Sequence, residues 1–223
     1  MSNCPECRLF KGISDEDRDK MYACAGARER RFKNGEYIFR QGDSTANLYL
    51  LLEGTVMLAK DFASGKRSVL YTVHEGDVFG EMFGFSNETE FWYDAVASGS
   101  VKLMEIPWKF FYGFCSNACH KHQDVLKNML NIQADNNFVM VKKLYLLSGK
   151  TLKERIAMWV LDSARRSDHF KATMNREELA DYLGTTRPSL SRELMNMQEE
   201  GLIEVDRSDF KITDREGLEG LSE

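Results

Sequence analysis

The stretch NREELADYLGTTRPSLSRELMNMQEEGLIEV, residues 175–205, decides the fold of the C-terminal part of the chain. Its apolar residues recur at helical spacing in two short segments. Gly184 lies between the segments, where glycine can end a helix in the left-handed conformation without a Cβ penalty. Thr186 can cap the second segment, and Pro188 falls in its first turn, where a missing N–H costs nothing. The stretch therefore predicts a helix-turn-helix.

The polar residues of this stretch are the candidate contacts to DNA. We expect the apolar residues to pack the two helices together: Leu179, Ala180, Leu183, Leu190, Leu194 and Met197. Arginine reads guanine bidentately, and hydroxyls contact phosphates or base edges. The predicted DNA-binding residues are Arg176, Thr185, Thr186, Arg187, Ser189, Ser191 and Arg192. An ordinary helical hairpin with a solvated polar face is the alternative, but turn, caps and exposed face all agree with the first interpretation.

Charge does not by itself indicate a nucleic-acid binder. The formal net charge is −5, and residues 147–223 contain 12 Lys/Arg and 16 Asp/Glu. DNA binding therefore requires the basic residues to gather on one face, and it then depends steeply on salt. The residues expected there are Arg165, Arg166, Lys171, Arg176, Arg187 and Arg192.

Residues 30–107 are short apolar runs separated by glycine-containing turns. Strands of this length and spacing are typical of a β-sandwich or jelly roll. We therefore predict an α+β chain whose N-terminal jelly-roll domain, residues 1–108, senses an effector.

Residues 109–147 contain no proline and no glycine after Gly113. Apolar and small polar residues recur there at three- and four-residue steps: Val125, Met129, Ile132, Asn136 and Val139. This pattern predicts one long amphipathic helix that pairs with its copy in a second subunit as a parallel coiled coil, with Asn136 or Asn137 fixing the register. A core helix within one domain is the alternative.

Ser148-Gly149-Lys150 is the candidate hinge to a domain of residues 148–223. This domain is expected to contain a helix from Thr151 to Arg166, the helix-turn-helix, and a hairpin wing around Arg207-Ser208-Asp209.

The motifs in this order resemble the CRP/FNR family of bacterial transcription regulators, over essentially the whole chain. They are NGEYIFRQGD at 34–43, LLEGTV at 51–56, EGDVFGE at 75–81, and LGTTRPSLSREL at 183–194 followed by EGLIEV. The resemblance implies a homodimer, allosteric control by an effector, no catalysis, and palindromic double-stranded DNA and RNA polymerase as partners. It also implies an unusual operator, because Pro188 stands where many members have a glutamate, and proline cannot accept from cytosine N4.

The residues argue against cyclic AMP as the effector. The nucleotide-binding members have an Arg-Ser pair where this chain has Trp92-Tyr93, and no Lys or Arg occurs between Gly76 and Val101. Only Glu81 matches the ribose-contacting glutamate. An aromatic or apolar ligand is favoured instead. The predicted effector-binding residues are Phe79, Gly80, Glu81, Met82, Phe91, Trp92, Tyr93 and Met140. The alternative is that the rings fill the jelly-roll core.

A redox- or metal-sensing regulator is the second functional hypothesis. Cys4 and Cys7 have the spacing of a two-thiolate clamp, and Cys115 and Cys119 lie near His120 and His122. Oxygen-sensing members of the family hold an iron–sulfur cluster with a further cysteine just before the EIP segment, where this chain has Met104. The cluster set is therefore incomplete. A thiol switch, and haem binding through His74 or Met82, remain alternatives.

Other classes of protein fit the sequence less well. A cupin-type enzyme needs a histidine-rich metal set on its strands, and only His74 is near the motif. A regulatory module acting on a partner protein would not need a complete winged helix-turn-helix. No apolar run approaches a membrane span, no secretion signal is evident, and five cysteines is an odd number. We therefore expect a cytoplasmic protein with reduced thiols and no membrane partner.

Overall fold

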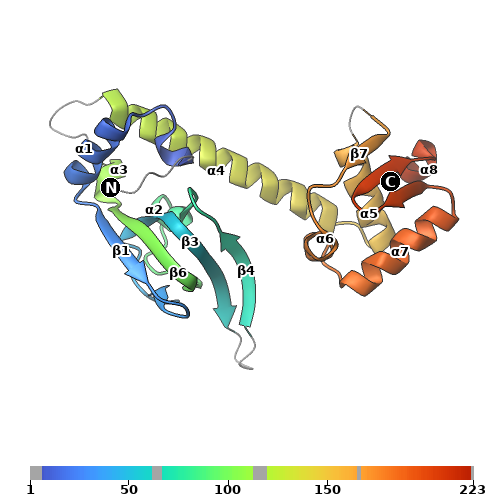
Figure 1. Ribbon diagram of the computed structural model, residues 1–223, viewed down its shortest axis with the longest axis horizontal. Helices are drawn as coiled ribbons and strands as arrows, with labels where there is room; N and C mark the ends of the chain where they lie inside the picture. The colour runs from blue at the N-terminus through green and yellow to red at the C-terminus, as the bar shows by residue number, and fades with distance from the viewer. Residues whose placement is uncertain (1–6, 62–66, 113–119, 165–166, 222–223) are drawn as a thin grey trace. The chain divides into compact units, whose positions relative to one another are not determined.

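The computed structural model describes residues 7–61, 67–112, 120–164 and 167–221 (Figure 1). The chain forms two compact units, Met1–Ala134 and Asp135–Glu223. Across the described ranges, no helix has both the length and the apolarity to cross a membrane.

The N-terminal unit is built on an antiparallel sheet. After the short helices η1 (Arg8–Phe10) and α1 (Asp15–Ala25), the strands are β1 (Arg28–Phe32), β2 (Tyr37–Phe39), β3 (Asn47–Asp61), β4 (Arg67–Val73), β5 (Val78–Phe79) and β6 (Asp94–Pro107). The order is β1-β6-β3-β4, with β2 on β6 and β5 on β3, and every pair is antiparallel. The predicted jelly-roll-type domain is confirmed.

Two details of this sheet differ from the prediction. The last two apolar runs form a single strand, β6, because glycine at position 99 is accommodated at positive φ within the strand. The run VFGEMF is a two-residue strand followed by helix α2 (Glu81–Gly84). Gly80 separates them with φ of 78°, in the left-handed region that favours glycine.

The predicted single helix over residues 109–147 is described as two helices. Helix α3 covers Lys109–Tyr112 and helix α4 covers His120–Leu147, and the residues between them lie outside the described ranges. Helix α3 belongs to the N-terminal core because Phe110 and Phe111 are buried there.

Helix α4 contributes side chains to both units. Val125, Met129 and Ile132 are buried in the N-terminal core, and Leu146 is buried in the C-terminal core. The first three were predicted to belong to one stripe with Val139, which is exposed instead. The predicted stripe thus packs on the N-terminal core in its first turns and is exposed further along the same side, at Val139.

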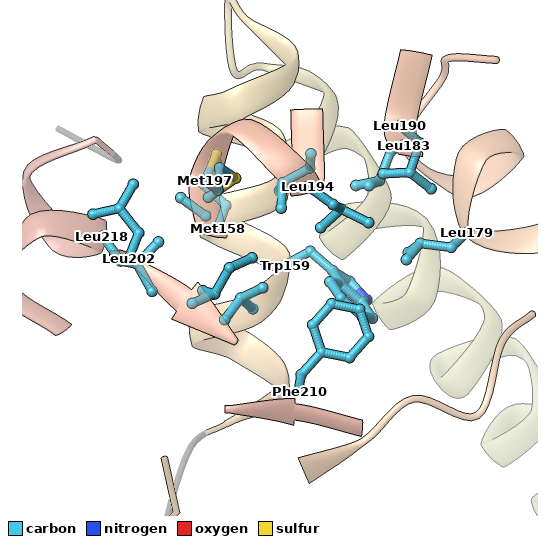
Figure 2. Close-up of a cluster of buried hydrophobic side chains, with 14 of the residues drawn as sticks. Met158, Trp159, Leu179, Leu183, Leu190, Leu194, Met197, Leu202, Phe210 and Leu218 are labelled. Atoms are coloured by element: carbon cyan, nitrogen blue, oxygen red, sulfur yellow. The ribbon is translucent and has the colours of Figure 1, made fainter. Parts of the chain in front are cut away.

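The C-terminal unit is a winged helix-turn-helix, as predicted. Its further elements are α5 (Leu152–Ser163), β7 (His169–Lys171), α6 (Arg176–Tyr182), α7 (Arg187–Glu199), β8 (Ile203–Asp206), β9 (Asp209–Ile212) and α8 (Arg215–Gly220). The sheet order is β7-β9-β8, and β7 and α8 were not predicted. Figure 2 shows Trp159 facing Phe210 in the core, where their ring centroids lie 5.1 Å apart.

Candidate nucleic-acid interface and effector region

The turn between α6 and α7 is fixed by local contacts. Asn175 and Glu178 form a capping box at the start of α6, in which each side chain accepts a hydrogen bond from the backbone N–H of the other residue. Gly184 has φ of 65°, and Thr185 N–H donates to Ala180 O at 2.9 Å. The chain therefore turns sharply, and the turn fixes the direction in which α7 begins.

Helix α7 begins as the sequence predicts. The Thr186 hydroxyl accepts from Ser189 N–H at 3.4 Å and lies 2.9 Å from the Ser189 hydroxyl. Leu190, Leu194 and Met197 are buried in the core. Because they occupy one side of α7, the other side is exposed and available to a partner.

The exposed side of α7 carries most of the predicted DNA contacts. Thr186, Arg187, Ser189, Ser191 and Arg192 are exposed, and Thr185 is half-buried. Their exposure is what contact with a partner requires, and DNA contact by these residues stays a prediction.

The two arginines of α7 differ in their surroundings. Arg187 Nη1 lies 3.8 Å from Glu177 Oε2 on α6, and both side chains are more than half exposed. Exposed pairs of this kind contribute little to stability, so the pair restrains Arg187 weakly. For Arg192, no ion pair occurs within the described part of the chain. Both guanidinium groups are therefore accessible to an anionic or base-edge partner.

Arg176 has a different environment from the other predicted contacts. Its Nη2 donates to Arg207 O at 2.8 Å, and its guanidinium lies 5.2 Å from the centroid of the Phe210 ring. Burial lowers the pKa of Arg176. The side chain thus holds the wing against α6, a role that sequence reasoning did not assign to it.

The wing turn is held from a second side as well. Arg207 adopts φ of 53°, the one positive φ among the described residues other than glycine. Ala172 N–H donates to Ser208 O at 2.7 Å, next to strand β7. Lys171 on β7 is exposed and pairs in register with Asp209. Arg165 and Arg166, the other predicted basic residues, lie outside the described ranges.

Three of the predicted effector-binding rings are core side chains. Phe79, Phe91 and Tyr93 are buried together, with Phe39 stacked on Phe91 at 3.6 Å between ring centroids. Burial raises the pKa of the Tyr93 phenol, and the charge of Glu81 adds to this. These rings contact one another rather than line an open surface, which is the alternative the sequence left open. Their role in binding an effector stays a prediction.

The accessible part of the predicted site is smaller. Met82 and Trp92 are exposed, Glu81 is partly exposed at the start of α2, and Gly80 is buried beside it. Met140 is exposed on α4 in the other unit.

Two residues of this region were missed by the sequence reasoning. Lys60 Nζ lies 3.7 Å from the Trp92 ring centroid and donates to Trp92 O at 2.9 Å, so strand β3 supplies a cation that the segment after Gly76 lacks. Burial raises the pKa of Tyr71 on β4, and the charges of Asp77 and Glu81 add to this.

A groove of about 510 Å³ lies elsewhere in the N-terminal unit. Residues of α1, β1, β3 and β6 line it, among them Tyr22, Leu52 and Met104. None of the predicted effector-binding residues lines it.

The described cysteines and histidines do not form a metal centre. Cys7 is buried and Cys24 is exposed, while His122 is buried with its Nε2 2.6 Å from Phe110 O. Within the described ranges, no three His, Cys, Asp or Glu residues are grouped so that they could hold a metal ion. Cys4, Cys115 and Cys119 lie outside these ranges. Met104 stands on β6 opposite Leu50, so this position offers a thioether in place of a thiolate.

Comparisons with known proteins agree with this architecture. The cyclic nucleotide-binding domain family matches residues 29–118, and the Crp-like helix-turn-helix domain family matches residues 154–221. Electron transport regulator A of Shewanella oneidensis is 28% identical over 87% of this chain and 78% of its own length. Transcriptional activator protein FnrA of Stutzerimonas stutzeri is 26% identical over 99% of this chain and 93% of its own length.

A solved structure supports the same assignment over nearly the full length. The catabolite activator protein of Thermus thermophilus is 26% identical, and the match covers 96% of this chain and 98% of that protein with a TM-score of 0.55. Both halves of the chain thus match the two domains of one family, in the same order. The chain belongs to the CRP/FNR family, whose members are DNA-binding transcription regulators and not enzymes.

Proposed function

We propose that this protein is a homodimeric regulator that binds palindromic DNA through α7 and is controlled by a small aromatic or apolar effector. The observation that carries the DNA-binding part is the exposed side of α7, where Arg187 and Arg192 project from a helix whose other side is buried. A helix with one anchored side and basic residues on the other can enter the major groove without losing its packing.

The exposed residues of α4 support dimerisation. Leu130, Ala134, Asn137, Val141 and Leu144 follow one another at alternating four- and three-residue steps, and all five are exposed. This is the seven-residue repeat of a two-stranded coiled coil. Asn137 stands in the middle of the repeat, where a buried amide favours one register at some expense of stability. A second copy of α4 is the partner that satisfies this pattern.

Dimerisation also gives the DNA-binding helices their spacing. Two α7 helices related by a twofold axis reach successive major grooves when they lie about 34 Å apart. Effector binding that changes this spacing changes the DNA affinity, which is the allosteric coupling that we propose. Contact with RNA polymerase would follow from this family role, and we propose it on that ground alone.

The effector region is proposed to lie around α2, where Met82, Trp92 and Tyr71 are exposed and Glu81 is partly exposed. Exposed aromatic and thioether groups next to one carboxylate suit an aromatic ligand with a hydrogen-bond donor. The Lys60 ammonium is engaged by Trp92, so a phosphate would have to displace this contact.

A redox signal is the second candidate, and one observation favours it. One relative is named an electron transport regulator, and it matches 87% of this chain. Cys4 and Cys7 are the thiols we would assign to such a switch. The donors in the described ranges do not fit a cluster, because Met104 replaces a thiolate and no three donors are grouped. We therefore propose no step that depends on a metal.

The test of the DNA-binding proposal uses the full chain and a duplex obtained by binding-site selection. Fluorescence anisotropy is measured for wild type, for Arg192→Ala and for Arg31→Ala. The Arg31 side chain is 75% exposed on β1, far along the chain from α7. We expect Arg192→Ala to weaken binding by about 1–3 kcal/mol per half-site and Arg31→Ala to leave it unchanged. Equal effects of the two substitutions would contradict the proposal.

The effector proposal has a separate measurement. Aromatic acids and phenols are screened by their effect on tryptophan emission of wild type and Met82→Ala, and then by their effect on DNA affinity. We expect at least one ligand that binds wild type more tightly than the variant and changes DNA affinity. Cluster bands in the visible absorption spectrum of protein purified without oxygen would contradict the metal-free form of the second candidate.

A further inference from the structure

The outer side of α7 carries an apolar residue among its polar ones. Met195 is 58% exposed, and no other large hydrophobic residue is exposed in the described part of the chain beyond α4. A single exposed methionine needs no explanation on most surfaces. On α7, the position of Met195 suggests a reason for its exposure.

Met195 lies in the same stripe as Arg192. Pro188, Arg192, Met195 and Glu199 recur at steps of four, three and four residues, and all are exposed. The buried residues Leu190, Leu194 and Met197 occupy the opposite side. A partner that meets the Arg192 guanidinium from outside therefore meets the Met195 thioether as well.

The spacing along the helix places these two side chains on neighbouring base pairs. Three residues advance an α-helix by about 4.5 Å, and successive base pairs lie about 3.4 Å apart. A helix lying in the groove with Arg192 at one base pair thus brings Met195 to the next base pair or the one after it.

The chemistry of the major groove identifies the group that a methionine can recognise there. Its base edges present hydrogen-bond donors and acceptors, with one apolar group, the C5 methyl of thymine. A thioether makes no useful contact with phosphate, whereas its flexible, polarisable chain packs well on a methyl group. Pro188 adds a second apolar surface in the first turn of α7.

We propose that Met195 is a specificity-determining residue that packs on the C5 methyl of a thymine, one or two base pairs from the guanine read by Arg192. The inference rests on the proposed DNA-binding function and deepens it. It states that the half-site contains a guanine and a nearby thymine whose methyl group, and not only its hydrogen-bonding edge, is recognised.

The test replaces thymines by deoxyuridine, which removes the methyl group and leaves base pairing intact. A duplex selected by the full-length wild-type protein is prepared with each thymine of the half-site replaced in turn, in both half-sites together. We expect one thymine at which replacement weakens wild-type binding roughly fourfold per half-site, the factor for one buried methyl-sized group. With Met195→Ala, binding is weaker from the start, and the same replacement has no further effect.

Three controls separate recognition from general damage. Met195→Leu keeps an apolar side chain and is expected to retain most of the deoxyuridine effect. Met195→Ala is expected to keep the wild-type dependence of affinity on salt, because no phosphate contact is lost. Ser191→Ala, a change on the same exposed side, is expected to leave the deoxyuridine effect intact.

The outcomes distinguish the inference from the function beneath it. If wild type binds the selected duplex and tolerates deoxyuridine at every thymine, the inference is overturned and DNA binding stands. An equal loss for wild type and Met195→Ala at the sensitive thymine also overturns it, since another residue then contacts the methyl group. If no duplex can be selected at all, the proposed function and the inference both fall.

Discussion

Replacing Gly184 by alanine tests how the structure sets the turn before α7. The backbone there has φ of 65°, and an added Cβ would lie 3.1 Å from Leu147 Cδ2. The left-handed conformation costs a non-glycine residue about 1–2 kcal/mol. Displacing the Leu147 side chain, which is 40% exposed, adds about 1 kcal/mol. We expect Gly184→Ala to lower the free energy of unfolding of the C-terminal unit by about 2–3 kcal/mol.

Gly201→Ala is the matched control. Gly201 has φ of 76°, with no heavy atom within 4 Å of an added Cβ, so this variant carries the backbone cost alone. Leu147→Ala should remove the crowding, so adding it to Gly184→Ala should bring the effect down to that of Gly201→Ala. Urea-dependent hydrogen exchange of peptides from α6 and α7 measures this unit by itself. The reasoning is refuted if Gly184→Ala costs no more than Gly201→Ala, or if Leu147→Ala leaves the difference unchanged.

Three further predictions each concern one side chain. Arg176→Met removes the hydrogen bond to Arg207 O but keeps an apolar stem, and should destabilise the C-terminal unit by about 1.5–3 kcal/mol in the same exchange experiment; an unchanged stability would mean that the wing is held without it. Val141→Asp should convert the dimer to monomer in light scattering, whereas Val139→Asp, equally exposed at 55% but off the seven-residue repeat, should not; loss of the dimer in both would argue against the repeat as the interface. Burial raises the pKa of Tyr49 from 10.0 to about 12, so the stability that the neutral phenol contributes is present below pH 10 and is lost as the pH rises to 12. The urea midpoint should therefore fall less steeply between pH 10 and 12 in Tyr49→Phe than in wild type. Identical pH profiles would contradict the raised pKa of Tyr49.

The sequence predicts well those features that depend on neighbours within a few residues. The Thr186 cap, the left-handed Gly184 and the buried positions of α7 all follow from local spacing, and the structure has each of them. The wing hairpin is similarly local, since Arg207 and Ser208 join two strands that pair directly.

Features that join distant parts of the chain could not be predicted in the same way. Phe39 stacks on Phe91, and Lys60 reaches Trp92, although each pair is far apart in sequence. The aromatic run near residue 91 therefore resembles a binding surface in the sequence, while most of it is core. Arg176 likewise resembles a DNA contact in the sequence. Its hydrogen bond to the Arg207 carbonyl joins residues far apart in the chain, so local spacing does not reveal it.

The long helix shows a third kind of limit. Its apolar residues recur at helical spacing, but some pack on the N-terminal core, one packs on the C-terminal core, and others form an exposed repeat on a different side of the helix. Periodicity indicates that a residue lies on a given side of a helix. It does not indicate which partner covers that side, so Val125 and Val139 were assigned to one stripe.

The most direct test of the central claim is binding-site selection from random double-stranded DNA with the full-length protein, with and without a bacterial small-molecule extract. We predict enrichment of a palindrome whose half-sites are centred about one helical turn apart, and loss of that enrichment when Arg187 and Arg192 are both replaced by alanine. If no sequence is enriched under either condition, or if the double variant selects the same palindrome as wild type, α7 does not read DNA and the account is contradicted.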